Sequence, residues 1–75
     1  PFTSRTTVQF TTAGGHTLLQ VFDTLGRLIT VLTNQEYTAG TYRIDFDSEG
    51  LPAGLYYARF QNGITQQVRA MMKVR

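Results

Sequence analysis

Apolar and polar residues alternate along most of this chain with a period of two, and glycine-rich stretches interrupt the alternation. The alternating segments are rich in Thr, Val, Ile, Tyr and Phe, a composition typical of half-buried β-strands. No segment keeps a helical period of about 3.6 residues over several turns. The pattern therefore predicts six strands, at residues 5–12, 17–23, 27–33, 41–47, 54–61 and 64–74.

Strands this short and this regularly spaced predict an all-β fold, either an antiparallel sandwich or a barrel. A seventh short strand near Glu36 and Tyr37 is an alternative. We find no internal repeat and no low-complexity linker. In the fourth strand, Tyr42, Ile44 and Phe46 alternate with charged residues and are expected to face the core. Leu51 is expected to plug the core, and the following residue, a proline without a backbone donor, ends this region.

Residues 23–26, Asp-Thr-Leu-Gly, predict the turn between the second and third strands. Asp23 stands at the first position of the turn, where its carboxylate can accept backbone N–H groups. Gly26 stands where a residue with left-handed backbone geometry would close a three-residue loop with a bulge.

The last hairpin has two readings, which differ in the length of the loop around Asn62–Gly63. A two-residue loop would place Tyr56 opposite Arg69, and a three-residue loop would place Tyr56 opposite Val68. The second register collects the apolar residues on one face: Tyr56, Ala58, Phe60, Ile64, Val68, Ala70, Met72 and Val74. Because a slip of one residue turns every side chain to the other face, we prefer this cleaner register.

In this register the reverse face of the hairpin carries four of the basic residues, namely Arg59, Arg69, Lys73 and Arg75. The functional interpretation is a docking surface for an acidic partner, a phosphate-bearing glycolipid or a translocation receptor. The alternative is that basic residues on a terminal strand only prevent edge-to-edge pairing. An exposed edge strand would also allow weak self-association.

Size and composition limit the remaining choices. The chain has 75 residues, which we assign to a single domain at 1–75, with a net charge of +2 and no cysteine. It therefore has no disulfide and no thiolate for a metal site. No apolar run approaches the roughly 20 residues of a membrane helix. The chain begins at Pro1 without a leader pattern, so we expect it to be a piece of a longer protein.

Catalysis is not expected, and neither is a cofactor. His16 is the only histidine, and no nucleophile motif surrounds Ser4 or Ser48. Tyr57, on the exposed face of its strand, could serve a sugar-binding surface, but nucleic-acid binding would require more aromatic residues.

A calcium site is left open. Asp45, Asp47 and Glu49 match the first half of a calcium-binding loop, but its twelfth position is Tyr56 instead of a glutamate. The alternative is an acidic strand edge that faces the solvent and runs into a turn.

Four segments carry a family resemblance. They are the Asp turn with its Gly-Arg step in residues 19–29, the Gly-x-Tyr step in Ala39–Tyr42, the Leu-Pro-x-Gly-x-Tyr sequence in Leu51–Tyr56, and the basic and apolar terminal strand at 68–75. In this order and spacing they resemble the type A C-terminal sorting domain of the type IX secretion system.

The resemblance implies a non-enzymatic, immunoglobulin-like sandwich of six to seven strands at the C-terminus of secreted proteins from Bacteroidetes and relatives. It implies N-terminal cargo domains, an outer-membrane translocon that recognises the domain, and a sortase-like signal peptidase that removes it. The protein would pass through the periplasm to the outer membrane, the cell surface or the medium.

The resemblance also suggests roles for individual residues. Gly54 would set backbone geometry, Tyr56 would pack, and the segment Met72, Lys73, Val74 and Arg75 would support recognition or take part in it. Among exposed residues, the basic set of the last hairpin would contact the partner. One departure is that Ala70 stands where the family commonly has lysine.

Two alternatives remain at this point. The Asp-x-x-Gly-Arg and Leu-Pro-x-Gly-x-Tyr sequences also resemble the immunoglobulin-like domain of flagellar hook-capping proteins. A structural or carbohydrate-binding sandwich of an extracellular enzyme is the other alternative.

Overall fold

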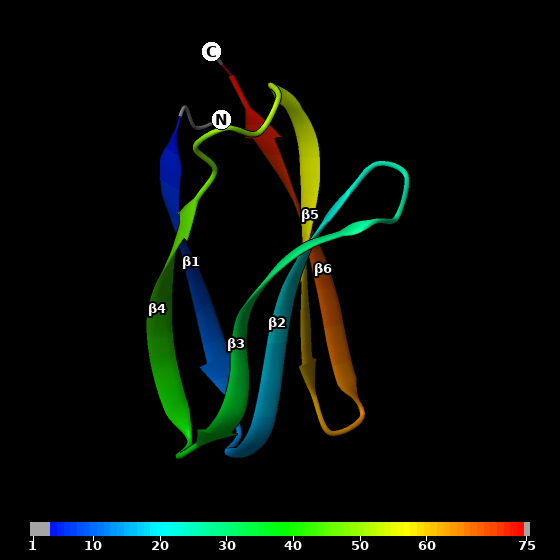
Figure 1. The fold of residues 1–75 in the computed structure, drawn as a ribbon. Coiled ribbons are helices and arrows are strands. Elements are labelled where there is room, and N and C mark those ends of the chain that lie inside the picture. Colours follow the sequence, from blue (N-terminus) through cyan, green and yellow to red (C-terminus); the bar gives the residue numbers. More distant parts are fainter. Residues whose placement is uncertain (1–3, 75) are drawn as a thin grey trace.

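The computed structural model describes residues 4–74, which form six β-strands and no helix (Figure 1). The strands are β1 (Arg5–Thr12), β2 (Gly15–Asp23), β3 (Leu28–Tyr37), β4 (Gly40–Asp47), β5 (Gly54–Asn62) and β6 (Thr65–Lys73). β1 and β4 form a two-stranded sheet, and the other strands form a four-stranded sheet in the order β3-β2-β5-β6. All pairings are antiparallel. The part of the chain at 4–74 contains no helix of a length and apolarity that would cross a membrane.

The two sheets face each other as an immunoglobulin-like β-sandwich, which confirms the predicted fold class (Figure 1). The six predicted strands are confirmed as well, with ends that shift by up to four residues. The alternative of a seventh strand near Glu36 and Tyr37 is wrong. These residues continue β3, because they remain paired with His16 and Gly15 of β2.

The core lies between the sheets, where alternate residues of both sheets point inward. Its buried apolar residues are Val8, Phe10, Leu19, Val21, Phe46, Tyr56, Ala58 and Phe60. Tyr42, Ile44 and Leu51 pack against this cluster, as predicted.

Aromatic rings connect the two sheets within this core. The Phe10 ring of β1 lies 5.4 Å from Tyr37 of β3 and 5.8 Å from Phe60 of β5, measured between ring centroids. It also stacks on Tyr42 of β4 at 5.7 Å. Since backbone pairing runs within each sheet, such side-chain contacts supply the attraction between the sheets.

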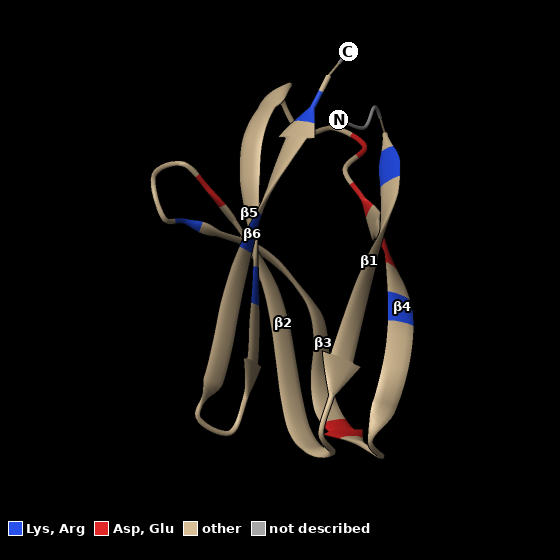
Figure 2. Cartoon of the chain, turned by 180° about the vertical axis from the view of Figure 1, so that it is seen from behind, with Lys and Arg blue, Asp and Glu red and all other residues tan. Residues whose placement is uncertain are grey.

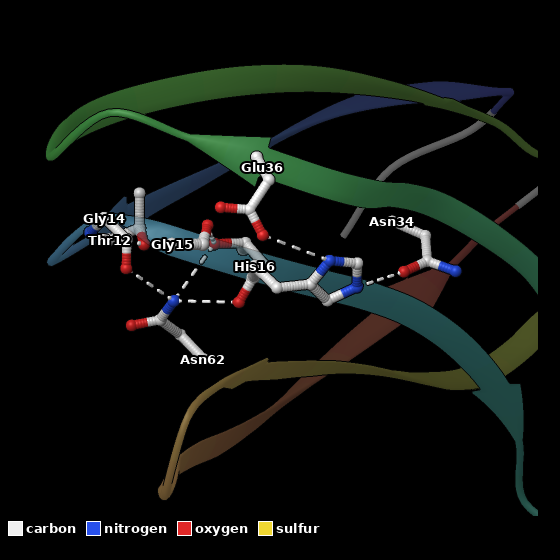
Figure 3. A network of polar contacts seen from close by, with 8 residues as sticks. Thr12, Gly14, Gly15, His16, Asn34, Glu36 and Asn62 are labelled. Atoms are coloured by element: carbon white, nitrogen blue, oxygen red, sulfur yellow. Dashed lines mark hydrogen bonds and ion pairs between the residues drawn. The ribbon is translucent and has the colours of Figure 1, made fainter.

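The chain passes from one sheet to the other three times, between β1 and β2, between β3 and β4, and between β4 and β5. Asn62 secures the first passage (Figure 3). Its side-chain Nδ2 lies 2.9 Å from the His16 carbonyl oxygen, 3.1 Å from that of Gly14 and 3.2 Å from the Thr17 hydroxyl. The buried hydroxyls of Thr12 and Thr17 meet at 3.0 Å beneath it.

The register predicted for the last hairpin is wrong. Asn62 pairs with Thr65, so the loop consists of Gly63 and Ile64, and Tyr56 lies opposite Met71. Gly63 has a φ of 59°, as the first central residue of a type II′ turn requires. Both readings of the sequence placed Asn62 in the loop, whereas Asn62 stays in β5 and its amide is engaged at the first passage.

The Asp23 turn is confirmed. Asp23 Oδ1 accepts the backbone N–H groups of Leu25 and Arg27, both at 2.9 Å. Gly26 has a φ of 81°, and the backbone of Asp23 bonds that of Arg27 across a three-residue loop. The Arg27 side chain closes the turn with an Nε–Oδ2 distance of 2.7 Å. The hydrogen bond from the Arg27 N–H is the main cause that lowers the pKa of the Asp23 carboxyl, against the opposing effect of desolvation.

We expect Asn62→Asp to destabilise the domain by about 1–3 kcal/mol, because a carboxylate has no donor for the carbonyls of Gly14 and His16. The measurement is the free energy of unfolding by urea. Gln35→Glu is the matched control, since it adds the same charge at an exposed position of β3. Equal stability of the two variants would contradict the role assigned to Asn62.

The Asp23 turn also predicts a pH dependence. Because folding lowers the pKa of Asp23 from its usual value of 3.8, the ionised carboxylate stabilises the fold above that value. This contribution is lost as the pH falls through the lower, folded-state pKa. The difference in unfolding free energy between the natural chain and Asp23→Asn should therefore narrow below pH 3.8. A difference that stays constant down to the acid limit of folding would refute this expectation.

Candidate functional site

The residues of the Leu-Pro-x-Gly-x-Tyr sequence form a corner at the passage from β4 to β5. Tyr56 is 5% exposed, and its hydroxyl donates a hydrogen bond to the Pro52 carbonyl at 2.7 Å. This contact is a tyrosine corner, in which a tyrosine bonds the backbone a few residues upstream. It holds the incoming loop against the first residues of β5.

The passage from β3 to β4 is built in the same way. The Tyr42 hydroxyl donates to the Thr38 carbonyl at 2.7 Å, again four residues upstream. The two corners share the sequence x-Ala-Gly-x-Tyr, at residues 38–42 and 52–56. The expectation of no internal repeat is therefore wrong at this small scale. The five-residue repetition was the sequence signal for a shared structural role.

Gly54 is the first residue of β5 and has a φ of 150°. Residues with a β-carbon rarely adopt this conformation, and no atom lies within 4 Å of the position where a Cβ would stand. Backbone conformation, and not lack of space, therefore requires glycine here. This agrees with the geometric role expected for Gly54.

Lys73, the last residue of β6, binds the loop at the same corner through two hydrogen bonds, which we call the Lys73 clasp. Its half-buried ammonium group donates to the carbonyl oxygens of Ser48 and Leu51, each at 2.7 Å. Ser48 is fully buried, and its backbone N–H and its hydroxyl both donate to the Ser4 carbonyl. The clasp joins the end of the chain to the loop between β4 and β5. The sequence left open whether Lys73 contacts a partner or supports the fold, and it gave no signal for these two carbonyl partners.

The other predicted basic residues do not share one face. Arg59 lies opposite Val68 on the outer face of the large sheet, where its Nη2 donates to the Gln66 side chain at 3.2 Å. Arg69 lies opposite the buried Ala58 and therefore belongs to the inner face of β6. The predicted single basic face is wrong, because the observed register turns Arg69 to the other side.

The last residues of the chain differ in position. Met72 lies opposite Leu55 on the outer face and is 44% exposed. Val74 follows β6 and is 40% exposed. Arg75 lies outside the described residues.

Two of the three acidic residues of the calcium alternative, Asp45 and Asp47, are engaged with separate side chains of β1. Asp45 accepts a hydrogen bond from the Thr7 hydroxyl at 2.9 Å, and Asp47 pairs with Arg5 at 3.7 Å. Across residues 4–74, no group of three or more His, Cys, Asp and Glu side chains comes together as a metal site. His16 binds Asn34 at 2.5 Å and lies 3.7 Å from Glu36 on the surface of the sandwich (Figure 3).

The fold and its tyrosine corners define a small immunoglobulin-like module whose signature residues build the scaffold. The family model described as secretion system C-terminal sorting domain matches residues 1–74. The chain therefore belongs to this family of type IX secretion sorting domains, which is a generally non-catalytic class of signal domain. The match does not favour the sugar-binding or hook-capping alternatives. A search of curated proteins and a search of solved structures found no significant match.

We expect Tyr56→Phe to lower the free energy of unfolding by about 1 kcal/mol, because the variant keeps the ring and loses only the bond to Pro52. The measurement is urea unfolding followed by circular dichroism. Tyr57→Phe is the matched control on the neighbouring, half-exposed residue and should change stability little. The tyrosine corner would be unimportant if both variants unfolded at the same urea concentration.

Proposed function

We propose that this domain is a non-catalytic signal that directs N-terminal cargo across the outer membrane through the type IX secretion system. The observation that carries the proposal is the family match over residues 1–74. In this proposal an outer-membrane translocon recognises the domain after its transit through the periplasm, and a sortase-like signal peptidase then removes it. The cargo reaches the cell surface or the medium.

The contacts of the signature residues suggest how the signal is read. Gly54, Tyr56 and Lys73 are engaged in the corner between β4 and β5, which leaves little of them for direct contact with a partner. We assign these residues to structural support, so the recognised object is the folded sandwich and not an extended tail. Direct contact falls to residues whose side chains reach the solvent, with the half-buried Arg59 on the outer face and the exposed Arg69 on the inner face as the candidates.

The hydrophobic surface near the C-terminus supports a contact on the outer face. Val68 is 64% exposed there, and Met72 lies on the same face, next to Tyr57 and Leu55 of β5. Exposed apolar groups of this kind, together with an arginine, are typical of the centre of a protein interface. Val74 and Arg75 would extend this contact in the proposal.

The test is export of a reporter fused in front of the domain, in a host with this pathway. Deletion of residues 68–75 removes most of β6 together with the Lys73 clasp, so secreted reporter should fall to background. Efficient export of the truncated fusion would contradict the proposed function. Western blots of the periplasm must show that the truncated fusion is present.

Two charge reversals separate recognition from folding. Arg59→Glu and Arg69→Glu lie on opposite faces of the same hairpin, and both residues have side chains that reach solvent. A loss of export with an unchanged melting temperature would identify the face that the translocon reads. Normal export of both variants would refute the assignment of these two residues, while the function itself would still rest on the deletion.

A further inference from the structure

An open groove of about 650 Å³ lies between the two sheets, on the side of the sandwich away from β3 and β4. Four strands line it. The lining residues are Val8, Gln9, Phe10 and Thr11 of β1, Leu19 of β2, Ala58 and Phe60 of β5, and Gln67, Val68 and Arg69 of β6. The groove exists because the small sheet has two strands and the large sheet four, so no strand of the small sheet covers β6.

Free strand edges form the two walls of this groove. Within residues 4–74, β1 pairs only with β4, and β6 pairs only with β5. The lining includes consecutive residues of each strand, Val8–Thr11 and Gln67–Arg69. Because successive side chains point to opposite faces, consecutive residues line a groove together where the strand edge itself faces it. Unpaired backbone groups along such an edge can accept an added strand.

The floor of the groove is apolar, and its side chains are almost fully buried. Phe10, Leu19, Ala58 and Phe60 are each less than 8% exposed. Ala58 lies between Val21 and Arg69 in its sheet and has the smallest side chain of these four residues. An extended segment placed along β1 would cover this floor with every second side chain.

The charges at the groove identify the chemistry of its occupant. Arg69 is exposed at the rim, and in the described part of the chain its side chain has neither a hydrogen bond nor an ion pair. No acidic residue occurs in β1, β5 or β6, whereas β4 and the segments next to it carry Asp45, Asp47 and Glu49 (Figure 2). A carboxylate on the incoming segment would complement Arg69.

We propose that this groove is a binding site for an extended peptide strand of a partner protein, which adds to the free edge of β1. The strand alternates apolar residues, which lie on Phe60 and Ala58, with polar ones, and it carries a carboxylate that reaches Arg69. The backbone bonds to β1 supply affinity and the carboxylate supplies selectivity, as in other cases of strand addition. The inference goes beyond the proposed function, because strand binding is a property of the isolated domain.

A second copy of the chain fits the groove less well. The edge of β1 contains Arg5 and no acid, so pairing of two β1 strands would bring no carboxylate to Arg69. In β4 the acids Asp45 and Asp47 alternate with the inward-facing Ile44 and Phe46, so they point away from the groove side of a sandwich. The edge strand β3 carries one acid, Glu36, which already lies 3.7 Å from the His16 ring. A partner of different sequence is therefore favoured.

The experiment uses the 75-residue chain and a short capped peptide that alternates Thr and Val around one central Glu. Titration followed by amide hydrogen exchange should show saturable binding and slower exchange in Val8–Thr11, by about tenfold or more. Arg69→Glu should weaken binding about tenfold, and a peptide with Lys in place of Glu should restore it. Gln66→Glu, which adds a negative charge at an exposed position on the outer face of the same hairpin, is the matched control and should bind like the natural chain.

Several results would overturn the proposal. The first is no change in the exchange of Val8–Thr11 at millimolar peptide. The second is equal affinity of the natural chain and Arg69→Glu for the Glu peptide. Protection confined to Gln67–Arg69 would show that the strand adds to β6 instead. Protection of β1 that rises with protein concentration in the absence of peptide, together with a dimer in sedimentation, would show that a second copy fills the groove.

Discussion

The whole fold depends on hydrogen bonds from polar side chains to the backbone, which occur at each segment where the chain passes from one sheet to the other. A sandwich has no backbone hydrogen bonds between its two sheets, so the sheets are held by packing and by the geometry of the connecting segments. In this domain each of the three passages has its own tether. Asn62 holds the first, the Tyr42 hydroxyl the second, and the Tyr56 hydroxyl with the Lys73 ammonium group the third. In a domain of 75 residues without disulfides, these tethers act together with the packed core to fix how the sheets lie.

These tethers give a structural use to signature residues that are buried or half-buried. Gly54 provides a backbone conformation, Tyr56 a buried ring with a donor, and Lys73 two bonds to one loop. A signal that is built from such residues specifies a folded shape. The surface of that shape is then free to carry the contacts, with an apolar outer face around Val68 and a groove on the inner side of β6.

Much of the fold could be predicted from alternation and turn chemistry, because both act over a few neighbouring residues. The strand positions, the Asp23 turn and the inward direction of Tyr42, Ile44 and Phe46 followed from such local signals. The register of the last hairpin did not. The predicted register placed the apolar residues of β6 on its inner face, as would be needed if the other sheet covered this strand. In the structure the inner face of β6 lines an open groove, so the polar residues Gln67 and Arg69 can occupy it. Each tyrosine corner depends on a hydrogen bond between a side chain and a carbonyl group four residues upstream, and the alternation of apolar residues carries no information about such a bond. The repeated Ala-Gly-x-Tyr sequence was the only signal for the two corners.

The most direct measurement is the unfolding free energy of the double variant Tyr42→Phe, Tyr56→Phe, compared with the natural chain. Both substitutions keep the aromatic ring in place, so the change in unfolding free energy isolates the contribution of the two hydroxyl groups. We expect the free energy of unfolding to fall by about 2 kcal/mol, which is the sum of two independent hydrogen bonds at separate passages. A double variant as stable as the natural chain would contradict the claim that these tethers hold the sandwich together.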